Sequence, residues 1–481
     1  MSMQAPAVGA REQCDLLIRN GYLITMDGNR TVYARGAVAV GGRLIVAVGS
    51  EPDVLARYAG RRVIDARGAP VHPGFVDAHY HIPNHLTRGV FPDAATTKEY
   101  YLFYARWYDQ MDAEDEHASG LAAGLEMLRN GVTCYMEGGT VFETDAVAAA
   151  AEAVGIRASL SEPFLWDTGQ DATLTNMTRS RPETKRCLSQ LGRELRRNRS
   201  PEALVRGHVC LFGSGSASDE LVVAATDVAE KNGAVFSQHQ STSVAGTAAH
   251  EALLGRHPLV HFAELGVLRP HCAYTHMNVI REDEAEVVVR SGMSLIWCPA
   301  ISMNWGFLGS GRRRPQPDLY RRGVNVGLAA DVSKFGVDTS PLTAYLLSRD
   351  AGDATQLAAE EVFEMATVGS ARAMGIWDRI GSLEAGKCAD IVIRSASLPE
   401  FQPGHYLVQN LLLASRGKSV DTVIVDGQIV VRSGHSTRVD EGVVYDTARR
   451  RATALGRRIG AAPVPRWPVV EAAGMAGMQA Q

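Results

Sequence analysis

The stretch "HPGFVDAHYHIPNHLTRG", residues 72–89, joins a Pro-Gly turn, an apolar run and a His-x-His pair. The apolar run indicates a buried strand, and alternate side chains of a strand point to the same side. His79 and His81 can therefore face one point at the end of this strand. The pair predicts half of a metal site whose other ligands come from distant parts of the chain.

Residues 73–374 repeat the pattern of a short apolar strand followed by a longer helical stretch. The expected strands are 74–79, 131–137, 156–163, 205–213, 234–239, 272–276, 293–299 and 324–331. Eight strands that mostly alternate with helices predict an α/β fold, a (β/α)8 barrel of the TIM type. A doubly wound open sheet is the alternative, but no GxGxxG segment follows the first strand, so the barrel is favoured.

Both ends of the chain are rich in short β-runs that are split by glycine-containing turns, at 14–49 and at 380–396 and 419–434. Such runs are typical of antiparallel strands joined by tight turns. The predicted domains are a small composite β-sandwich from residues 1–72 and 375–440, a barrel from residues 73–374, and a C-terminal helix and tail from residues 441–481.

Composition narrows the class of protein. Hydrophobic residues make up 46% and charged residues 21% of the chain, as in soluble globular proteins. A net charge of −4 argues against nucleic acid or an anionic membrane as the main partner. No apolar run approaches the ~18 residues of a membrane span, and no secretory signal is visible. Seven cysteines without a CxxC pair favour reduced thiols, so we expect a cytoplasmic protein.

Further candidate ligands follow later strands of the predicted barrel. His239, His276 and Asp331 end the expected strands 234–239, 272–276 and 324–331. Chemistry on a (β/α)8 barrel is located at the carboxyl ends of the strands. Imidazoles with one carboxylate suit a catalytic Zn²⁺ site with an open position, although iron, manganese and cobalt also accept this set.

Five segments together resemble the amidohydrolase superfamily, in the branch with cytosine and guanine deaminases and triazine hydrolases. They are "HPGFVDAHYHIPNHLTRG", "AEKNGAVFSQH", "THMN", "VNVGLAADVS" and "GSLEAGKCADIVI", and the likeness covers nearly the whole chain. The resemblance implies a barrel with a composite β-sandwich, one catalytic divalent metal, and hydrolysis at a carbon that bears nitrogen. It also implies a homo-oligomer, a dimer or larger.

The resemblance assigns roles to five residues. His79 and His81 match the ligands of the first strand, and His239 and Asp331 match those of the fifth and eighth strands. His276 matches the histidine of the sixth strand, which contacts substrate and the reacting oxygen.

Two details refine this assignment. His271 competes with His276 for the role on the sixth strand, and His276 is preferred because it ends the apolar run "CAYTH". Binuclear relatives have a bridging lysine on the fourth strand, and the segment "VRGHVCLFG" has none, which favours one metal.

One residue departs from the pattern of the deaminases. They have a glutamate three residues after the histidine of the fifth strand, and this chain has Thr242 there, in "HQSTSVAG". A threonine hydroxyl cannot act as a general acid or base near neutral pH, because its pKa is far too high. Glu137, at the end of the expected second strand, is considered as a replacement that reaches in from elsewhere.

The missing glutamate shapes the predicted reaction. A metal lowers the pKa of its bound water from about 15.7 to about 7, Asp331 accepts the proton and passes it to the leaving nitrogen, and His276 helps to stabilise the oxyanion. This set suffices for an amide-, urea- or carbamate-like C–N bond in a small nitrogenous, aromatic or heterocyclic substrate. Deamination or dechlorination of an N-heterocycle is the alternative, and a non-catalytic barrel of the same fold is a second alternative.

Other residues are candidates for contact with a small-molecule substrate, with no nucleic acid or membrane as partner. They follow expected barrel strands or the ligand motifs, where an apolar pocket is expected. They are Arg88, Trp166, Thr242 and Trp305.

Overall fold

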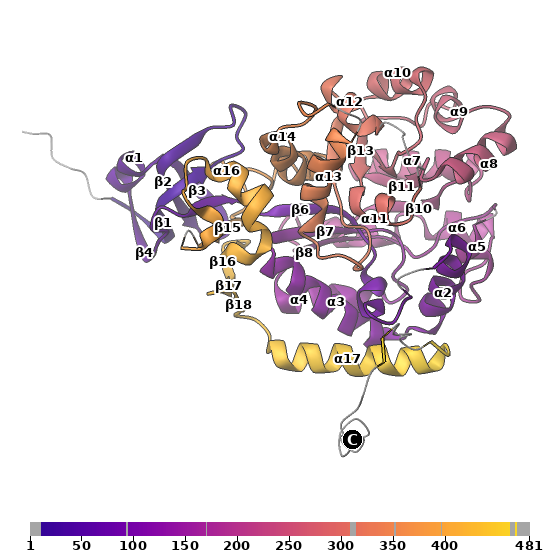
Figure 1. The fold of residues 1–481 in the computed structure, drawn as a ribbon, viewed down its shortest axis with the longest axis horizontal. Helices are drawn as coiled ribbons and strands as arrows, with labels where there is room; N and C mark the ends of the chain where they lie inside the picture. Colours follow the sequence, from indigo (N-terminus) through magenta and orange to yellow (C-terminus); the bar gives the residue numbers. More distant parts are fainter. Residues whose placement is uncertain are drawn as a thin grey trace, which may run out of the picture.

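The computed structural model describes residues 11–92, 95–169, 171–307, 314–350, 353–395, 397–461 and 467–468. Its central part consists of two parallel sheets of four and five strands (Figure 1). The first sheet contains β6 (Phe75–Tyr80), β7 (Val132–Glu137), β8 (Arg157–Leu160) and β9 (Val205–Gly207). The second sheet contains β10 (Val209–Gly213), β11 (Phe236–Gln240), β12 (Cys272–His276), β13 (Ser294–Trp297) and β14 (Asn325–Leu328).

The two sheets meet at two seams. At the first seam, β9 and β10 follow each other across His208, so they form one strand that changes partner at this residue. At the second seam, the Asp331 N–H donates to the His79 carbonyl at 3.0 Å, and the His81 N–H donates to the Asp331 carbonyl at 2.7 Å. The described strands therefore close into the predicted (β/α)8 barrel, and the second seam places Asp331 beside the His-x-His pair.

Helices follow most strands of the barrel and pack their apolar faces on it. In α7 (Asp219–Lys231), for example, the Ser218 hydroxyl accepts from the Leu221 N–H, and Asn232 is the C-cap residue. The other helices between the barrel strands are α2 (Thr97–Gln110), α3 (Ala113–Arg129), α4 (Thr144–Val154), α5 (Ala172–Thr175), α6 (Thr184–Gln190), α8 (Val244–Leu254), α9 (Pro258–Glu264), α10 (Glu282–Ser291), α11 (Pro299–Asn304) and α12 (Pro315–Arg321). After β14 come α13 (Thr339–Arg349), α14 (Ala359–Glu364) and α15 (Ser370–Ala373).

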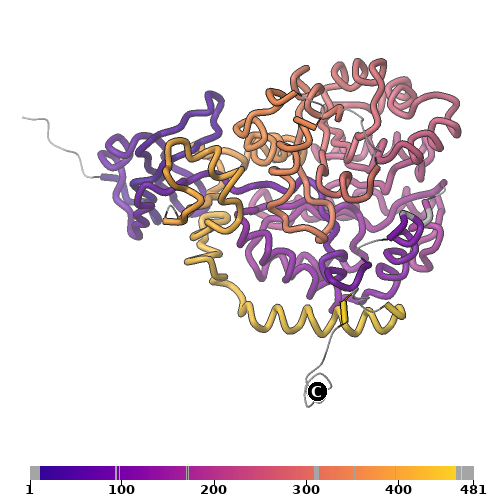
Figure 2. Tube along the Cα trace, in the orientation of Figure 1, coloured from indigo at the N-terminus to yellow at the C-terminus, as the bar shows by residue number. Residues whose placement is uncertain are grey.

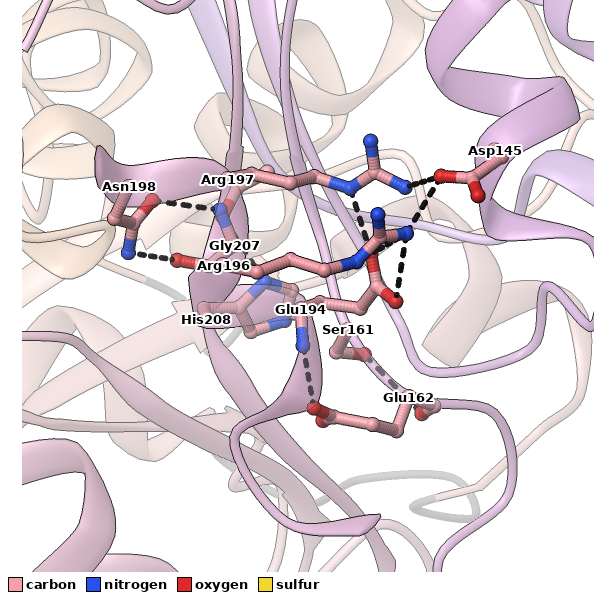
Figure 3. A network of polar contacts seen from close by, with 10 residues as sticks. Asp145, Ser161, Glu162, Glu194, Arg196, Arg197, Asn198, Gly207 and His208 are labelled. Atoms are coloured by element: carbon pink, nitrogen blue, oxygen red, sulfur yellow. Dashed lines mark hydrogen bonds and ion pairs between the residues drawn. The ribbon is translucent and has the colours of Figure 1, made fainter. Parts of the chain in front are cut away.

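The connection from β8 to β9 is held by a polar network (Figure 3). The Asn198 amide donates to the Gly207 carbonyl and accepts from the Gly207 N–H, both at 2.9 Å. Glu162 accepts from the Glu194 N–H at 2.8 Å, and the Glu194 carboxylate in turn accepts from Arg197 at 2.6 Å. These contacts hold the segment before β9 against Gly207 of β9 and against Glu162, which follows β8.

Strands from the two ends of the chain pair in one nine-stranded sheet next to the barrel (Figures 1 and 2). The strands are β1 (Glu12–Ile24), β2 (Val32–Gly41), β3 (Leu44–Ser50), β4 (Tyr58–Asp65), β5 (Pro70–Pro73), β15 (Ile391–Arg394), β16 (Val420–Val425), β17 (Gln428–Arg432) and β18 (His435–Ser436). The two ends meet where β15 pairs antiparallel with β5. Two short helices also belong to these segments, α1 (Glu51–Arg57) and α16 (Leu407–Asn410).

A buried ion pair links this sheet to the barrel. Arg157 of β8 donates to Asp390 at 2.7 Å and to Asp426 at 2.5 Å, and its side chain is almost fully buried.

The exact domain boundaries that the sequence suggests, at residues 72/73, 374/375 and 440/441, stay a prediction.

The C-terminal helix α17 (Glu441–Arg458) runs along the outside of α3 (Figure 1). Arg451 of α17 donates to the fully buried carboxylate of Asp115 at 2.6 Å. Of the predicted tail, residues 462–466 and 469–481 lie outside the described residues. Across the described chain, none of the helices combines the length and the apolar character that a membrane span requires.

Candidate metal centre and cavity

Four predicted ligands converge at the carboxyl ends of the barrel strands; His79, His81, His239 and Asp331 are called the ligand cluster below. The Nε2 atom of His81 lies 3.2 Å from that of His79, 3.3 Å from that of His239 and 3.4 Å from Oδ1 of Asp331. Two ligands of a tetrahedral zinc ion with bonds of about 2.1 Å are about 3.4 Å apart. The spacing is therefore that of atoms around one cation.

The outer nitrogens of the three imidazoles are all occupied. The His239 Nδ1 atom lies 2.6 Å from the Phe212 carbonyl oxygen, while Nδ1 of His79 and of His81 lies 3.2 Å from the hydroxyls of Thr275 and Thr140. A carbonyl only accepts, so His239 carries its proton on Nδ1 and has a lone pair on Nε2. Such outer contacts orient metal-binding histidines.

Electrostatics also fit a divalent cation. Burial lowers the pKa of His239 to about 4 and the pKa values of His79 and His81 well below the ordinary value. The rings are therefore neutral near pH 7 and able to bind a metal. Lone pairs of neutral imidazoles and a buried carboxylate that face one another repel, and a cation between them removes that repulsion. The donor set thus fits the group that the sequence predicts.

His276 and Asp331 share an unusual backbone. Their φ angles are +74° and +70°, in the left-handed region that non-glycine residues rarely adopt. Such conformations cost about 1–3 kcal/mol each and concentrate at functional sites. Nε2 of His276 lies 3.7 Å from Oδ2 of Asp331, and its Nδ1 has no hydrogen-bond partner in the described part of the chain. Burial, followed by the Asp77 carboxyl, raises the pKa of Asp331 well above its ordinary value.

Cys298 is a neighbour of this pair to which sequence reasoning gave no role. Its sulfur and the ligand atoms of His276 and Asp331 all lie within 4.8 Å of one another. Burial raises the pKa of Cys298 well above the ordinary value, so the group is a thiol near pH 7 and not the thiolate that binds metals. The sequence feature that could have identified Cys298 is its position directly after the strand that became β13.

A cavity of about 330 Å³ opens above the ligand cluster. Two residues predicted to contact substrate, Thr242 and Trp305, line it together with His276. The remaining lining is largely aromatic, and the name aromatic wall is used below for Tyr100, Tyr104, Tyr108, Trp305 and Phe307.

Sequence reasoning missed the three tyrosines of this wall. They follow one another every four residues in "YYLFYARWY", which places them on one face of α2. Burial raises the pKa of Tyr100 and of Tyr108 well above the ordinary value, so both remain neutral phenols. The available signal was this helical spacing, which equally fits a helix packed in a core.

Two other predicted contact residues are turned away from this cavity. Arg88 donates to the Ser333 carbonyl at 2.8 Å and to Glu126 at 2.7 Å, and so fastens the loop that follows Asp331. Trp166 is buried in an aromatic cluster and donates to the Ser180 hydroxyl at 2.8 Å. Neither side chain is among the described residues that line the cavity.

The structure also separates the alternatives for two roles. His271 lies just before β12, at the opposite end of the strand from His276, and its Nε2 lies 3.1 Å from the Thr226 carbonyl oxygen. Glu137 ends β7 behind His81, where its carboxylate accepts from Thr140 and from two backbone N–H groups. Glu137 is not among the described residues that line the cavity, so it does not replace the missing glutamate there.

A closed β/α barrel with three imidazoles and a carboxylate at the carboxyl ends of its strands defines the class of metal-dependent barrel hydrolases. Residues 71–430 match the model of the Amidohydrolase family. The chain therefore belongs to the amidohydrolase family, whose members bind a metal, and is a hydrolase that acts on C–N bonds.

Curated relatives match the chain over nearly its whole length. A 5-methylthioadenosine/S-adenosylhomocysteine deaminase of Desulforudis audaxviator is 30% identical over 451 residues, which is 92% of this chain and 99% of the relative. A 5'-deoxyadenosine deaminase of Methanosarcina mazei is 29% identical, over 92% of this chain and 99% of the relative.

Solved structures share the fold. An adenosine deaminase of Xanthomonas campestris with bound zinc has a TM-score of 0.82 and 27% identity, covering 93% of this chain and all of the other. An atrazine chlorohydrolase of Arthrobacter aurescens, at 21% identity, has a TM-score of 0.79 and covers 91% of this chain and all of the other. This second likeness concerns the fold alone.

Proposed function

We propose that this protein is a zinc-dependent deaminase that hydrolyses the exocyclic C–N bond of an aminated N-heterocycle and releases ammonia. The observation that carries the proposal is the ligand cluster, three members of which (His81, His239 and Asp331) line an aromatic cavity of about 330 Å³. The curated relatives that match 92% of the chain are deaminases of adenine nucleosides, which supports this substrate class.

The proposed site holds one zinc ion through the ligand cluster. When bound, the ion supplies Lewis acidity and lowers the pKa of a water molecule to about 7. Asp331 is the group that accepts a proton at its carboxylate and passes it to the leaving nitrogen. His276, with Nε2 beside that carboxylate, donates a hydrogen bond to the oxygen that becomes negative at the reacting carbon.

The aromatic wall orients the substrate in this proposal. Trp305 and Tyr100 lie with ring centroids 4.2 Å apart at one side of the cavity. Aromatic surfaces of this kind contact planar rings through large apolar areas. The hydroxyls of Thr242 and Ser214, 3.3 Å apart, offer hydrogen bonds to polar atoms at the edge of such a ring.

Thr242 favours a second candidate, hydrolysis of an amide-, urea- or carbamate-like bond. Protonation of a ring nitrogen needs an acid near the substrate, and among the described residues that line the cavity the carboxyl groups are Asp171 and Asp331. Asp171 is engaged as the N-cap of α5, where it accepts from the Thr173 N–H at 2.7 Å. Asp331 would then serve both proton transfers of a ring deamination, to the ring nitrogen and to the leaving nitrogen. Hydrolysis of an amide-, urea- or carbamate-like bond needs only the transfer to the leaving nitrogen.

The two candidates differ in their products. Zinc-reconstituted protein would be offered adenine nucleosides and other aminated heterocycles in one arm, and amides, ureas and carbamates in the other. We expect ammonia and the oxo-heterocycle from the first arm. An amine with an acid from the second arm alone supports the second candidate. No product in either arm, with zinc bound, supports the non-catalytic barrel and overturns both.

We also propose a small molecule as the substrate, a cytoplasmic location and a homo-oligomeric state. All seven cysteines are buried and free, which supports a reducing compartment. The oligomer rests on family likeness, and light scattering of the purified protein measures it directly.

A further inference from the structure

Glu137, the last residue of β7, begins the segment EGGT (residues 137–140), which lies directly against the ligand cluster. A Cβ atom on Gly138 would lie 2.5 Å from Cε1 of His81 and 2.7 Å from Cε1 of His79, so only a hydrogen atom fits there. Gly139 has a φ of +78°, which turns the chain so that Thr140 lies beside His81. Two glycines therefore bring a hydroxyl next to a metal-binding ring.

The partners of the Glu137 carboxylate determine the direction of each hydrogen bond. Its Oε2 atom accepts from the N–H groups of Gly139 at 2.7 Å and Thr140 at 2.9 Å. In the ionised form, its Oε1 atom accepts from the Thr140 hydroxyl at 2.5 Å. Burial raises the pKa of Glu137 from 4.5 to about 7. Above this pH the carboxylate has no proton to give, so all three bonds run toward Glu137.

The same reasoning extends to His81. The Thr140 hydroxyl has one proton, and that proton points to Glu137. Toward Nδ1 of His81, at 3.2 Å, the hydroxyl oxygen can therefore only accept. The proton of the neutral imidazole then lies on Nδ1, and the lone pair on Nε2 faces the other ligands.

His81 differs in this respect from His239. The proton of His239 is fixed by a backbone carbonyl, which always accepts. The proton of His81 is fixed by a hydroxyl, which accepts or donates according to its other partner. We propose that Glu137 and Thr140 are positioning residues that hold His81 in its metal-binding tautomer, with the proton on Nδ1 and the lone pair on Nε2. They do so because the Thr140 hydroxyl donates to Glu137 and can only accept from His81. The proposal rests on metal binding by the ligand cluster and is independent of the substrate.

Three substitutions separate direction from shape. Thr140→Val has a similar shape but no hydroxyl, and Thr140→Ser keeps the hydroxyl as the matched control. In Glu137→Gln the amide oxygen takes the place that accepts two backbone N–H groups, and the amide NH₂ faces the Thr140 hydroxyl. The NH₂ donates to Thr140, whose proton becomes free to point to His81. This single atom change reverses the direction of the hydrogen bonds from His81 to Thr140 and from Thr140 to residue 137. It therefore favours the proton of His81 on Nε2.

Zinc affinity is measured without substrate, by competition between zinc-loaded full-length protein and a chromophoric chelator. We expect Thr140→Val and Glu137→Gln to weaken zinc binding about 10- to 100-fold, the usual effect of removing an outer contact of a ligand. Thr140→Ser should remain close to the original protein. Equal affinity of all variants, with unchanged unfolding midpoints, would overturn the proposal, whatever the outcome of the deaminase assays.

The tautomer itself provides a second measurement that does not depend on the stability of any variant. Nitrogen-15 NMR of histidine-labelled protein, with His81 assigned by its substitution to asparagine, distinguishes a proton on Nδ1 from one on Nε2. At a pH above 7, where Glu137 is ionised, we expect Nδ1–H in the original full-length protein, with and without zinc. We expect a shift toward Nε2–H in metal-free Glu137→Gln. A proton on Nε2 of His81 in the original metal-free protein contradicts the inference.

Discussion

The ligand cluster and the aromatic wall border the same cavity, but their side chains are held in different ways. Each imidazole of the cluster has its outer nitrogen within 3.3 Å of a specific acceptor or hydroxyl, and the rings are buried. On the substrate side, the hydroxyls contact other hydroxyls, which can donate or accept: Thr242 lies 3.3 Å from Ser214, and Tyr104 lies 3.5 Å from Thr87. The ligand cluster is therefore held in one geometry, whereas the hydroxyls that line the cavity can change partners when a ligand binds.

The strongest test of this difference removes a ligand from the cluster. Asp331→Ala or His239→Ala should lose zinc and lower turnover by more than about 10³-fold, because water activation needs the bound ion. Metal analysis and turnover of purified protein measure both. His271→Ala, at the other end of β12, is the control and should keep zinc and activity. Activity retained by a zinc-free variant would end the proposed scheme.

A second test adds to the cavity lining the acid that the sequence lacks at position 242. Thr242→Glu should raise kcat/KM for an aminated heterocycle by up to about 10²-fold, since a placed general acid typically contributes 10²- to 10⁴-fold. Zinc content should not change, because Thr242 is not part of the ligand cluster. Thr242→Gln has the same shape without a titratable proton. If the glutamine variant gains as much as the glutamate variant, proton transfer is not the reason.

Changes within the wall should have smaller effects and should leave the metal in place. Trp305→Ala removes a ring that borders the cavity beside Tyr100. We expect KM to rise about 10-fold, which corresponds to about 1.4 kcal/mol of lost contact, with zinc content unchanged. Trp305→Phe should recover most of the loss. A loss of zinc in the alanine variant would mean that the aromatic wall and the ligand cluster are one cooperative unit.

A last test concerns stability and leaves the cavity unchanged: Glu116 is buried and accepts from the backbone N–H groups of Phe142 and Glu143. Burial raises the pKa of Glu116 from 4.5 to about 8. Between these values the folded protein binds one proton more than the unfolded chain at this site. The free energy of unfolding should therefore fall as pH rises through this window, by up to about 1.4 kcal/mol per pH unit.

Glu116→Gln removes this titration. Urea unfolding of both proteins between pH 5 and 8 should show a flatter dependence on pH for the variant. Parallel curves for the two proteins would show that Glu116 is ionised in the fold.

Much of the architecture follows from local pattern. The eight expected strands correspond to β6–β14, with β9 and β10 as one interrupted strand. Short apolar runs that alternate with helices are typical of parallel sheets, and eight of them fit a closed barrel. The His-x-His pair could be interpreted for the same reason: a period of two in a strand determines which side chains point to the same side. The prediction of functional roles for His239, His276 and Asp331 followed from their positions at the ends of expected strands and from the family resemblance.

Residues in the connecting segments depended on contacts between distant parts of the chain. Arg88 and Trp166 follow barrel strands as Trp305 does, yet Glu126 and Ser180 draw the first two away from the cavity. Conversely, the tyrosines of α2 face the cavity only because the segment after β6 folds back over the barrel mouth.

The sequence by itself thus determined the barrel and the residues able to bind a metal, because strand periodicity acts over a few neighbouring residues. Only the tertiary structure decided which side chains form the cavity wall and that Glu137 lies behind His81. The physical reason is that the direction of a side chain in a loop or on a covering helix depends on the partners available in the folded chain. Those partners are far away in sequence, as Glu126 is from Arg88 and Ser333.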